Sequence, residues 1–374
     1  MPQAPSPPVR QAGGRTNRPP RRAACRTGLE FARSTLDAGP VTSARQVRPY
    51  RPGDEAAILR AQSRVFSHVD PHWKGRTPES WRWRFLEAPA GSRIALEVLG
   101  DGEVRAQYAG LRQSMAGVAG PAHFTQSVDS FDTGRVDGGL SRKSGFVRAG
   151  EWFAREYGGS GESQDQVVFG LAIPAAWRIG SACLGYEHVR SVCSLAARLG
   201  ELDARRPSGL TLEETSRAPA DSAELFQRVA AERGILAVRD ARILDWRFAR
   251  HPEQRYVFGA VREGSLLRGL GVFRRGSFAG EEGGLLCDWL APGEDRDAQA
   301  GLLAWFAERT RAAGASQLVA LFPDTSPEWL ELQGRGFRVL PTPYVLAARS
   351  FSAPFDRDFL FWRWYYTLGD TDLV

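Results

Sequence analysis

A short segment of this chain occurs twice. "WRFLEAP" at 83–89 returns as "WRFARHP" at 246–252, with Trp, Arg, Phe and Pro at the same places. Three further similarities keep the same order: "SVDSFD" (127–132) with "LCDWLA" (286–291), "VVFGLAIPAAW" (167–177) with "LVALFPDTSPEW" (318–329), and "LGYEHV" (184–189) with "RGFRVL" (335–340). Four ordered similarities indicate an internal duplication. The chain is therefore expected to fold as two similar units, each of domain size.

The order of the repeated segments predicts the architecture of each unit. A helix precedes a few antiparallel strands, and then come a helix, a strand, a short helix and a final strand. This order predicts an α/β fold with a mixed, largely antiparallel central sheet flanked by helices. We expect a first domain at 46–205 and a second at 206–374. The aromatic segment "FLFWRWYYTLGD" (359–370) is expected to be a closing strand.

Residues 1–45 form a tail of different composition. The tail is rich in Pro, Gly and Arg, which predicts disorder. It lacks the apolar core of a secretory signal, whereas a transit peptide or a start codon assigned too far upstream would each explain it. Residues 1–46 hold eight arginines against Glu30 and Asp37, so they carry the whole net charge of +6. The remainder is neutral, which argues against nucleic-acid binding by the folded part.

The composition also argues against membrane and metal proteins. Apolar runs such as "LVALF" are far shorter than the ~18 residues of a membrane span, so a soluble, cytoplasmic protein is expected. The four cysteines are scattered with no C-x-x-C pair, which indicates neither a zinc site nor a disulfide framework. His68 and His72 flank "VDP", but the proline opposes placing both on one helical face. No metal site is expected.

The segment "GGLSRKSGFVRAGEWFAREYG" (138–158) has two interpretations. Glycines and cations fill its first eight positions, and apolar residues then follow at helical spacing, among them Phe153 and Tyr157. The N-terminus of a helix offers unpaired N–H groups and a positive dipole end, so this loop could hold phosphates. It could equally be a solvated basic loop before a core helix. Trp152, Phe153 and Tyr157 are expected in the core.

The chain resembles the GNAT-type N-acetyltransferases, and within them a bacterial subgroup with two copies of the fold. The resemblance rests on "VRPYRPGDEAAILRAQ" (47–62), the W-R-F-x-x-x-P segments, "VDS" (128–130) and the ending "WYYTLGDTDLV" (364–374). It implies acetyl-CoA as cosubstrate, with its pyrophosphate on a loop of the pattern Gln/Arg-x-x-Gly-x-Gly/Ala. The matching residues are Arg142, Lys143, Ser144, Gly145, Phe146 and Val147, with Val147 where the family has a small residue.

The second copy differs from the first at this loop. Its counterpart "APGEDRDAQAG" (291–301) carries Glu294, Asp295 and Asp297 at the start of the helix. Carboxylates there would repel a diphosphate by ~1–4 kcal/mol at contact distance. The first copy is therefore expected to hold acyl-CoA, and the second to be degenerate.

The resemblance also implies catalytic roles. The position of the family's usual general-acid tyrosine holds Ser181 in one copy and Leu332 in the other. Tyr186 is the next candidate for the acid, although it could be a buried aromatic. Asp129 is the candidate base, although it could cap a turn. Weaker candidates for the base are Asp132, His123 and Glu151, and the early loop with His68, Asp70 and His72 could line the acceptor pocket or be an ordinary polar loop.

Two functions remain open from the sequence. The first is an acyl-CoA-dependent N-acyltransferase that acetylates an amine of an amino sugar, an amino acid or a protein. The second is a catalytically inactive protein of the same fold that binds a ligand or a partner. The missing tyrosine and the imperfect loop favour the second, and the Arg-x-x-Gly in one copy favours the first.

Overall fold

The computed structural model describes residues 45–69, 73–135 and 144–373. All of its helices and strands belong to the unit Ser43–Val374. The predicted disorder of the tail, and the candidate residues Asp70, His72, Arg142 and Lys143, lie outside the described ranges. The proposed division at 205/206 stays a prediction.

The described residues of the first half form ten α-helices and β-strands in the expected order. They are β1 (Gln46–Pro49), α1 (Glu55–Val69), α2 (Pro78–Phe85), β2 (Ser92–Val98), β3 (Val104–Ala116), β4 (Ala122–Asp132), α3 (Gly145–Tyr157), β5 (Val167–Ala172), α4 (Pro174–Cys183) and β6 (Glu187–Arg198). Apolar residues alternate across β2: Ile94 and Leu96 pack against α1 and α2, whereas Ala95 packs against α3. Because side chains of a strand alternate between faces, these helices cover opposite faces of the sheet.

The second half repeats this order. Its elements are β7 (Thr211–Thr215), α5 (Ser222–Ala230), β8 (Leu236–Ala237), α6 (Ala241–Leu244) followed by a π-helical turn (Asp245–Ala249), β9 (Val257–Glu263), β10 (Leu266–Phe278), β11 (Glu281–Leu290), α7 (Arg296–Ala312), β12 (Gln317–Ala320), α8 (Pro327–Gly334), β13 (Arg338–Ser350) and α9 (Arg357–Arg363). The predicted mixed α/β fold with flanking helices is confirmed.

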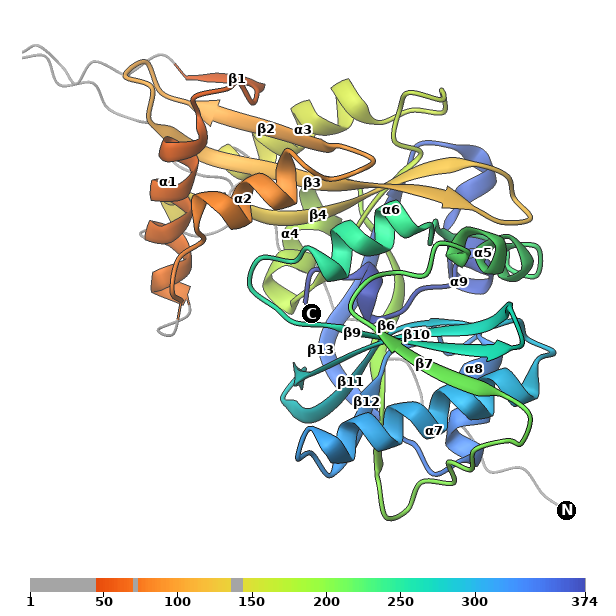
Figure 1. The fold of residues 1–374 in the computed structure, drawn as a ribbon. Helices are drawn as coiled ribbons and strands as arrows, with labels where there is room; N and C mark the ends of the chain where they lie inside the picture. The colour runs from red at the N-terminus through yellow and green to blue at the C-terminus, as the bar shows by residue number, and fades with distance from the viewer. Residues whose placement is uncertain (1–44, 70–72, 136–143, 374) are drawn as a thin grey trace, which may run out of the picture. The chain divides into compact units, whose positions relative to one another are not determined.

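The sheets of the two halves are joined by an exchange of their last strands. The strand order is β1-β2-β3-β4-β5-β13-β6-β12-β11-β10-β9-β7 (Figure 1). Strand β13, from the end of the chain, is antiparallel to β5 of the first half, and β6 is antiparallel to β12 of the second half. β13 and β6 also pair with each other. Each half therefore completes its sheet with the final strand of the other.

The duplicated tryptophans meet at the junction of the halves. The indole Nε1 of Trp83 donates to the carbonyl oxygen of Trp246 at 2.9 Å, and Trp246 Nε1 donates to the carbonyl oxygen of Trp83 at 3.0 Å. Their rings stack with centroids 5.2 Å apart. Both indoles are buried with their N–H groups satisfied, as buried tryptophans require. The repeat thus forms a symmetric contact with itself.

The prediction of a closing strand at 359–370 is wrong. Asp356 caps the N-terminus of α9, since its Oδ1 accepts from Phe359 N at 2.7 Å. The chain then extends only briefly, where Ile235 N donates to the carbonyl of Arg363 and Tyr365 N donates to the carbonyl of Ile235. An aspartate N-cap favours a helix over a strand, and the aromatic run concealed this signal.

Candidate functional site

Strands β4 and β5 run parallel for a short distance and then separate. They pair at Phe124–Val167, Thr125–Val168 and Gln126–Phe169, and the pairing ends there. Just beyond, Asp129 has φ +46°, a left-handed conformation uncommon for a residue other than glycine. The register between β3 and β4 shifts at the same place, which marks a β-bulge that bends β4 away from β5.

A cavity of about 390 Å³ lies where the two strands separate. Its walls come from α1, β3, β4, the start of α3, β5, α4 and the C-terminal part of the chain. The lining residues are Phe66, Tyr108, Ser127, Val128, Asp129, Ser130, Phe146, Gly170, Leu171, Ala172, Ile173, Ala176, Trp177, Gly180, Leu184, Tyr186, Tyr344, Ala347, Asp372 and Leu373. Two predicted catalytic residues, Asp129 and Tyr186, are therefore brought together in one cavity.

Asp129 is held by two arginines. Arg76 Nη2 donates to its Oδ1 at 2.9 Å, and Arg84 Nε lies 3.9 Å from its Oδ2. The three side chains are about nine-tenths buried. The two guanidinium groups thus fix the position of this carboxylate and occupy part of its hydrogen-bonding capacity.

The second half contains the same arginine–aspartate pair, which lines a smaller cavity of about 70 Å³. Arg239, which follows Arg76 by the period of the repeat, binds Asp288 through Nε at 3.1 Å and Nη2 at 3.2 Å. There β11 and β12 separate beyond Leu286 and Ala320. Buried aromatics fill the space between them: Trp289, Phe322 and Tyr365, whose hydroxyl donates to the Trp289 carbonyl at 3.2 Å.

Tyr186 faces the cavity beside a second tyrosine. Its hydroxyl is hydrogen-bonded to that of Tyr108, which is buried on β3. Burial raises the pKa of Tyr186 well above its ordinary value. Burial raises the pKa of Tyr108 as well. Both phenols therefore keep their protons at neutral pH, and Tyr186 can donate one to a group in the cavity.

The described part of the predicted phosphate loop begins α3, and the N–H groups of Phe146 and Val147 have partners from this chain. Ser144 is the N-cap, and its Oγ accepts from Val147 N at 3.3 Å. Phe146 N donates to Oδ2 of Asp132 at 3.1 Å, and Gly134 N donates to Oδ1 of the same carboxylate at 2.9 Å. The carboxylate of Asp132 thus lies at the position where the sequence predicts a pyrophosphate.

Packing explains two other residues of this loop. A Cβ at position 145 would collide with the carboxylate of Glu97, which is buried and bound by Arg148 at 2.5 Å. Val147 is buried in the core between α3 and the sheet. A small residue is therefore not needed at 147 for phosphate access, because this side chain points into the core.

The corresponding helix of the second half is capped by acid, as the sequence predicts. Oδ1 of Asp295 accepts from Ala298 N at 3.0 Å, and its carboxylate is bound by Arg268 at 2.6 and 2.7 Å. The carboxylate compensates the dipole of α7 without an external anion. Among the described parts of the chain, each half thus has an aspartate at this helix.

The remaining candidates lie away from the cavity. His123 is half-buried on β4 before the strands separate, and burial lowers its pKa. Glu151 is exposed on α3, and His68 is exposed near the end of α1. None of the three lines the cavity, whereas Phe66, two residues before His68, does.

Sequence reasoning missed Tyr108 and Asp372. Tyr108 stands in a β-prone stretch with no motif around it, and only the pairing of β3 brings it to Tyr186. Asp372 stands in the C-terminal segment that carried the resemblance, but no spacing connects it to β4. Its carboxylate Oδ1 accepts from Gln126 Nε2 at 2.9 Å.

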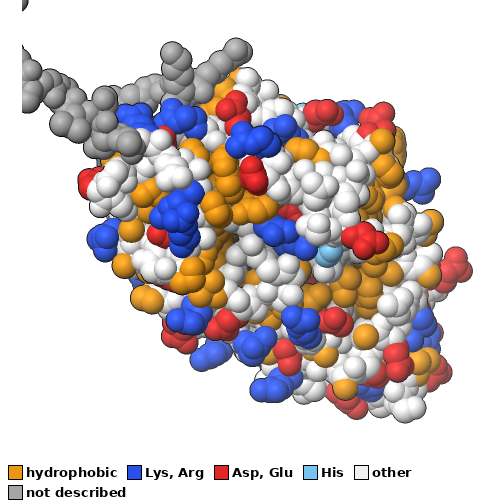
Figure 2. Space-filling model, turned by 90° about the horizontal axis from the view of Figure 1, so that it is seen from above, with side chains coloured by type: hydrophobic (Ala, Val, Ile, Leu, Met, Phe, Trp, Pro, Cys, Tyr) orange, Lys and Arg blue, Asp and Glu red, His pale blue; other side chains and the backbone are white. Residues whose placement is uncertain are grey.

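A metal site and a membrane-spanning helix are two further features that would bear on the function. Within the described residues, no group of three or more His, Cys, Asp or Glu side chains is placed to hold a metal ion. In the same residues no helix combines the length and the apolar character needed to cross a membrane. On the face seen in Figure 2, cationic and anionic side chains are interspersed.

Comparison with solved structures identifies the fold of this chain. No model of a protein family matches the sequence, and no curated protein matches it. A GCN5-related N-acetyltransferase from Anabaena variabilis is similar with a TM-score of 0.63 and 12% identity, over 83% of this chain and 73% of that chain. A protein from Enterococcus faecalis described as a probable N-acyltransferase is similar with a TM-score of 0.59 and 12% identity, over 83% and 73%.

A third solved structure has the same tandem organisation by its description. It is a tandem GNAT protein from the clavulanic acid biosynthesis pathway, with a TM-score of 0.51 and 14% identity, over 84% of this chain and 100% of that one. The element order, the separation of β4 from β5 and these similarities all indicate the same fold. The chain has the fold of the GCN5-related N-acetyltransferases, built as a tandem pair.

Proposed function

We propose that the protein is an acyl-CoA-dependent N-acyltransferase that acetylates an amine. The observation that carries this proposal is the cavity between β4 and β5, where the hydroxyl of Tyr186 and the carboxylates of Asp129 and Asp372 meet. Amide formation from a thioester needs a donor for the departing thiolate and an acceptor for the amine proton. The cavity contains side chains of both kinds.

The residues present fit the acyl-pantetheine part of acetyl-CoA. Beyond Gln126 and Phe169 the facing edges of β4 and β5 no longer pair with each other, so their backbone groups can bind an extended chain that carries amides. When bound there, acetyl-CoA supplies a thioester carbonyl open to attack by an amine. The diphosphate part is less well matched, because Asp132 already accepts from Phe146 N. Diphosphate binding by residues 142–147 stays a prediction.

The charges of the cavity favour a cationic acceptor. Asp129 and Asp372 both line it, and a protonated amine would be attracted to this side of the cavity. Amino sugars, amino acids and protein amines all carry such a group. An amine acceptor entering between the halves is therefore part of the proposal.

A specific observation favours the second candidate, a ligand-binding protein without turnover. Asp129 forms the same arginine pair as Asp288 in the half whose counterpart space is filled by aromatic side chains. An ion pair that recurs in both halves has a structural role in each. Under this alternative the cavity would bind a ligand and release no thiol.

Thermal stability with acetyl-CoA tests the binding step. A ligand at ~100 times its dissociation constant adds about 2.7 kcal/mol to the free energy of unfolding. Gly170 lines the cavity, and a Cβ there meets only Ser127 at ordinary contact distance. Gly170→Leu should therefore remove the shift by filling the space between the strands. Gly334→Leu is the matched control, since a Cβ at 334 meets nothing within 4 Å.

The outcomes separate the candidates. An unshifted wild type at millimolar acetyl-CoA would contradict acyl-CoA binding, and an undiminished shift in Gly170→Leu would contradict the location of the site. Arg142→Ala tests the predicted phosphate loop in the same assay. Thiol release over a library of amines then distinguishes an enzyme from a binding protein, because only the enzyme releases CoA.

A further inference from the structure

The last residues of the chain reach the cavity of the first half. Asp372 and Leu373 line it together with Tyr344 and Ala347 of β13. Helix α4 contributes to the same cavity. The proposed site is therefore built from both halves of the duplication.

Hydrogen bonds fix the position of this segment. Arg247 Nε donates to the carbonyl of Gly369 at 3.0 Å, and its Nη2 donates to the carbonyl of Thr371 at 2.7 Å. Gln126 Nε2, on β4, then donates to Oδ1 of Asp372. The carboxylate is thus held against β4 at the last residue pair before β4 and β5 separate.

Asp372 differs from Asp129 in its partners. Asp129 is bound by Arg76 and approached by Arg84. The Asp372 carboxylate accepts its hydrogen bond from the neutral amide of Gln126, and Arg84 and Arg247 contribute nearby positive charge. Of the two carboxylates that line the cavity, Asp372 is therefore the one held by an amide and Asp129 the one held by a guanidinium group.

We propose, on the basis of the N-acyltransferase function above, that Asp372 is the general base that accepts the proton of the acceptor amine. The amine nitrogen forms a bond to the thioester carbonyl carbon, and the carbon–sulfur bond breaks. The proton lost by nitrogen passes to Asp372, and Tyr186 donates its proton to the departing thiolate. The products are an amide and free CoA, and both side chains return to their starting protonation states by exchange with water.

The surroundings of Asp372 suit this role. Burial raises the pKa of its carboxyl group, and the nearby charge of Asp129 raises it further, whereas Arg84 and Arg247 oppose the shift. A carboxylate with a raised pKa is a stronger base at neutral pH than an ordinary one.

A second cavity beside Asp372 can hold water that accepts the proton from its carboxyl group. Asp372 also lines a space of about 70 Å³ between the halves, together with polar groups that include Gln113 and Ser114. A water needs ~10–15 Å³ of such space and two to four polar partners, so this cavity can hold water. The carboxylate of Asp372 lies between the reacting site and this second cavity.

The experiment measures kcat as a function of pH with acetyl-CoA and an amine that the wild type acetylates. The proteins compared are the full-length wild type, Asp372→Asn, Asp372→Glu and Asp129→Asn. In Asp372→Asn, kcat should fall by about 10²–10⁴-fold and should no longer rise with pH in the part of the profile where the wild-type kcat does. Its KM for acetyl-CoA should be unchanged, and Asp372→Glu should restore part of the rate. In Asp129→Asn, kcat should still rise with pH as in the wild type. Asp358→Asn, on the exposed surface of α9, is the control whose pH profile should not change.

The outcomes distinguish this inference from the proposed function. A wild type that releases thiol, with an Asp372→Asn variant that keeps the same rate and the same rise with pH, overturns the role of Asp372 alone. Loss of the rise with pH in Asp129→Asn rather than in Asp372→Asn assigns the base to Asp129 instead. A wild type that binds acetyl-CoA but releases no thiol with any amine overturns both. A purely structural role of Asp372 would change stability and leave the shape of the pH profile intact.

Discussion

Arg76 and Arg239 occupy the same position of the repeat, and each binds an aspartate on the strand that bends away from its neighbour. Thr77 and Asp240, the next residues, both cap the following helix through a side-chain oxygen. Side chains that serve the fold therefore recur with the period of the duplication. Asp372 belongs to the segment after the last repeated strand and has no counterpart in the repeat, which is consistent with a role in function rather than in the fold that the two halves share.

His251 gives the stability of the protein a pH dependence. Its Nδ1 accepts from Glu253 N at 3.1 Å and Gln254 N at 3.2 Å, so the ring must be neutral in the folded state. Burial, with a contribution from Arg247, lowers the pKa of His251 to about 3. An unfolded histidine has a pKa of about 6.5, so the unfolded chain binds the proton more readily between these values.

We predict that the free energy of unfolding falls as the pH is lowered from 6.5 towards 3. At pH 5 the loss from this group should reach up to about 2 kcal/mol. Urea unfolding of wild type and His251→Asn at pH 7 and pH 5 measures it, because asparagine can accept the same hydrogen bonds and does not titrate. An equal loss in the two proteins would assign the pH dependence to other groups.

At the scale of elements, the N-terminus of α3 is a helix start of the kind that binds phosphates, but a carboxylate of the chain lies there instead. The helix begins with Ser144 as its N-cap, and the chain supplies the anion through Asp132 at the end of β4. Arg105 Nε lies 3.7 Å from this carboxylate and partly balances its charge. The N–H group of Phe146 at this helix start is therefore already bound to a carboxylate of the chain.

Asp132→Asn should strengthen the binding of acetyl-CoA. Removing the negative charge relieves a repulsion of the order of 1–4 kcal/mol at contact distance, and we expect about tenfold tighter binding. The melting temperature without ligand should fall slightly, because the variant loses a charge at the helix N-terminus. Isothermal titration calorimetry measures the affinity.

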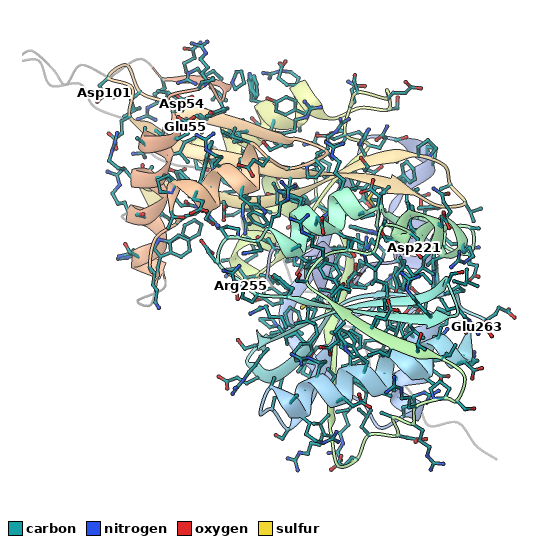
Figure 3. The ribbon with its side chains drawn as sticks, viewed as in Figure 1. Asp54, Glu55, Asp101, Asp221, Arg255 and Glu263 are labelled. Atoms are coloured by element: carbon teal, nitrogen blue, oxygen red, sulfur yellow. The ribbon has the colours of Figure 1, made fainter. Side chains whose placement is uncertain are left out.

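Two controls define what the charge does. Asp295→Asn removes the equivalent acid from α7 of the second half, and Asp101→Asn removes an acid from the turn between β2 and β3 (Figure 3). Neither should change the affinity by more than twofold. Unchanged or weaker binding by Asp132→Asn would show that the diphosphate does not approach α3.

For the molecule as a whole, the exchange of β6 and β13 decides how the halves depend on each other. β6 pairs with β12 and β13, and β13 pairs with β5, so the last strand of each half finds its partners in the other half. A half by itself leaves buried strand edges unpaired, and such edges promote association. The Trp83–Trp246 contact would be broken in the same way.

We therefore predict that neither half folds alone as a monomer. Residues 43–205 and 206–374 produced separately should be unfolded or aggregated, whereas co-expression should give a one-to-one complex with the circular dichroism spectrum of the intact chain. Size-exclusion chromatography with light scattering measures the stoichiometry. A stable, monomeric 43–205 fragment would contradict the dependence on strand exchange.

The sequence by itself determined the duplication and the order of helices and strands, whereas the phosphate loop of the first half stays a prediction. These features depend on local patterns, such as periodicity and capping residues, that neighbouring positions specify. The apolar residues at helical spacing in the segment 138–158 agree with α3, which runs from Gly145 to Tyr157. The prediction of a closing strand was wrong because aromatic residues, which are common in strands, here lie partly on a short helix, Arg357–Arg363.

Only the tertiary structure decided the rest. The pairing of β13 with β5, the arginine partners of Asp129, the capping of α3 by Asp132 and the arrival of Asp372 at Gln126 all join residues distant in the chain. Gln126 and Asp372 are 246 positions apart, so no spacing in the sequence indicates their contact. Which polar groups meet in a buried site follows from packing and strand register, and these are properties of the whole sheet.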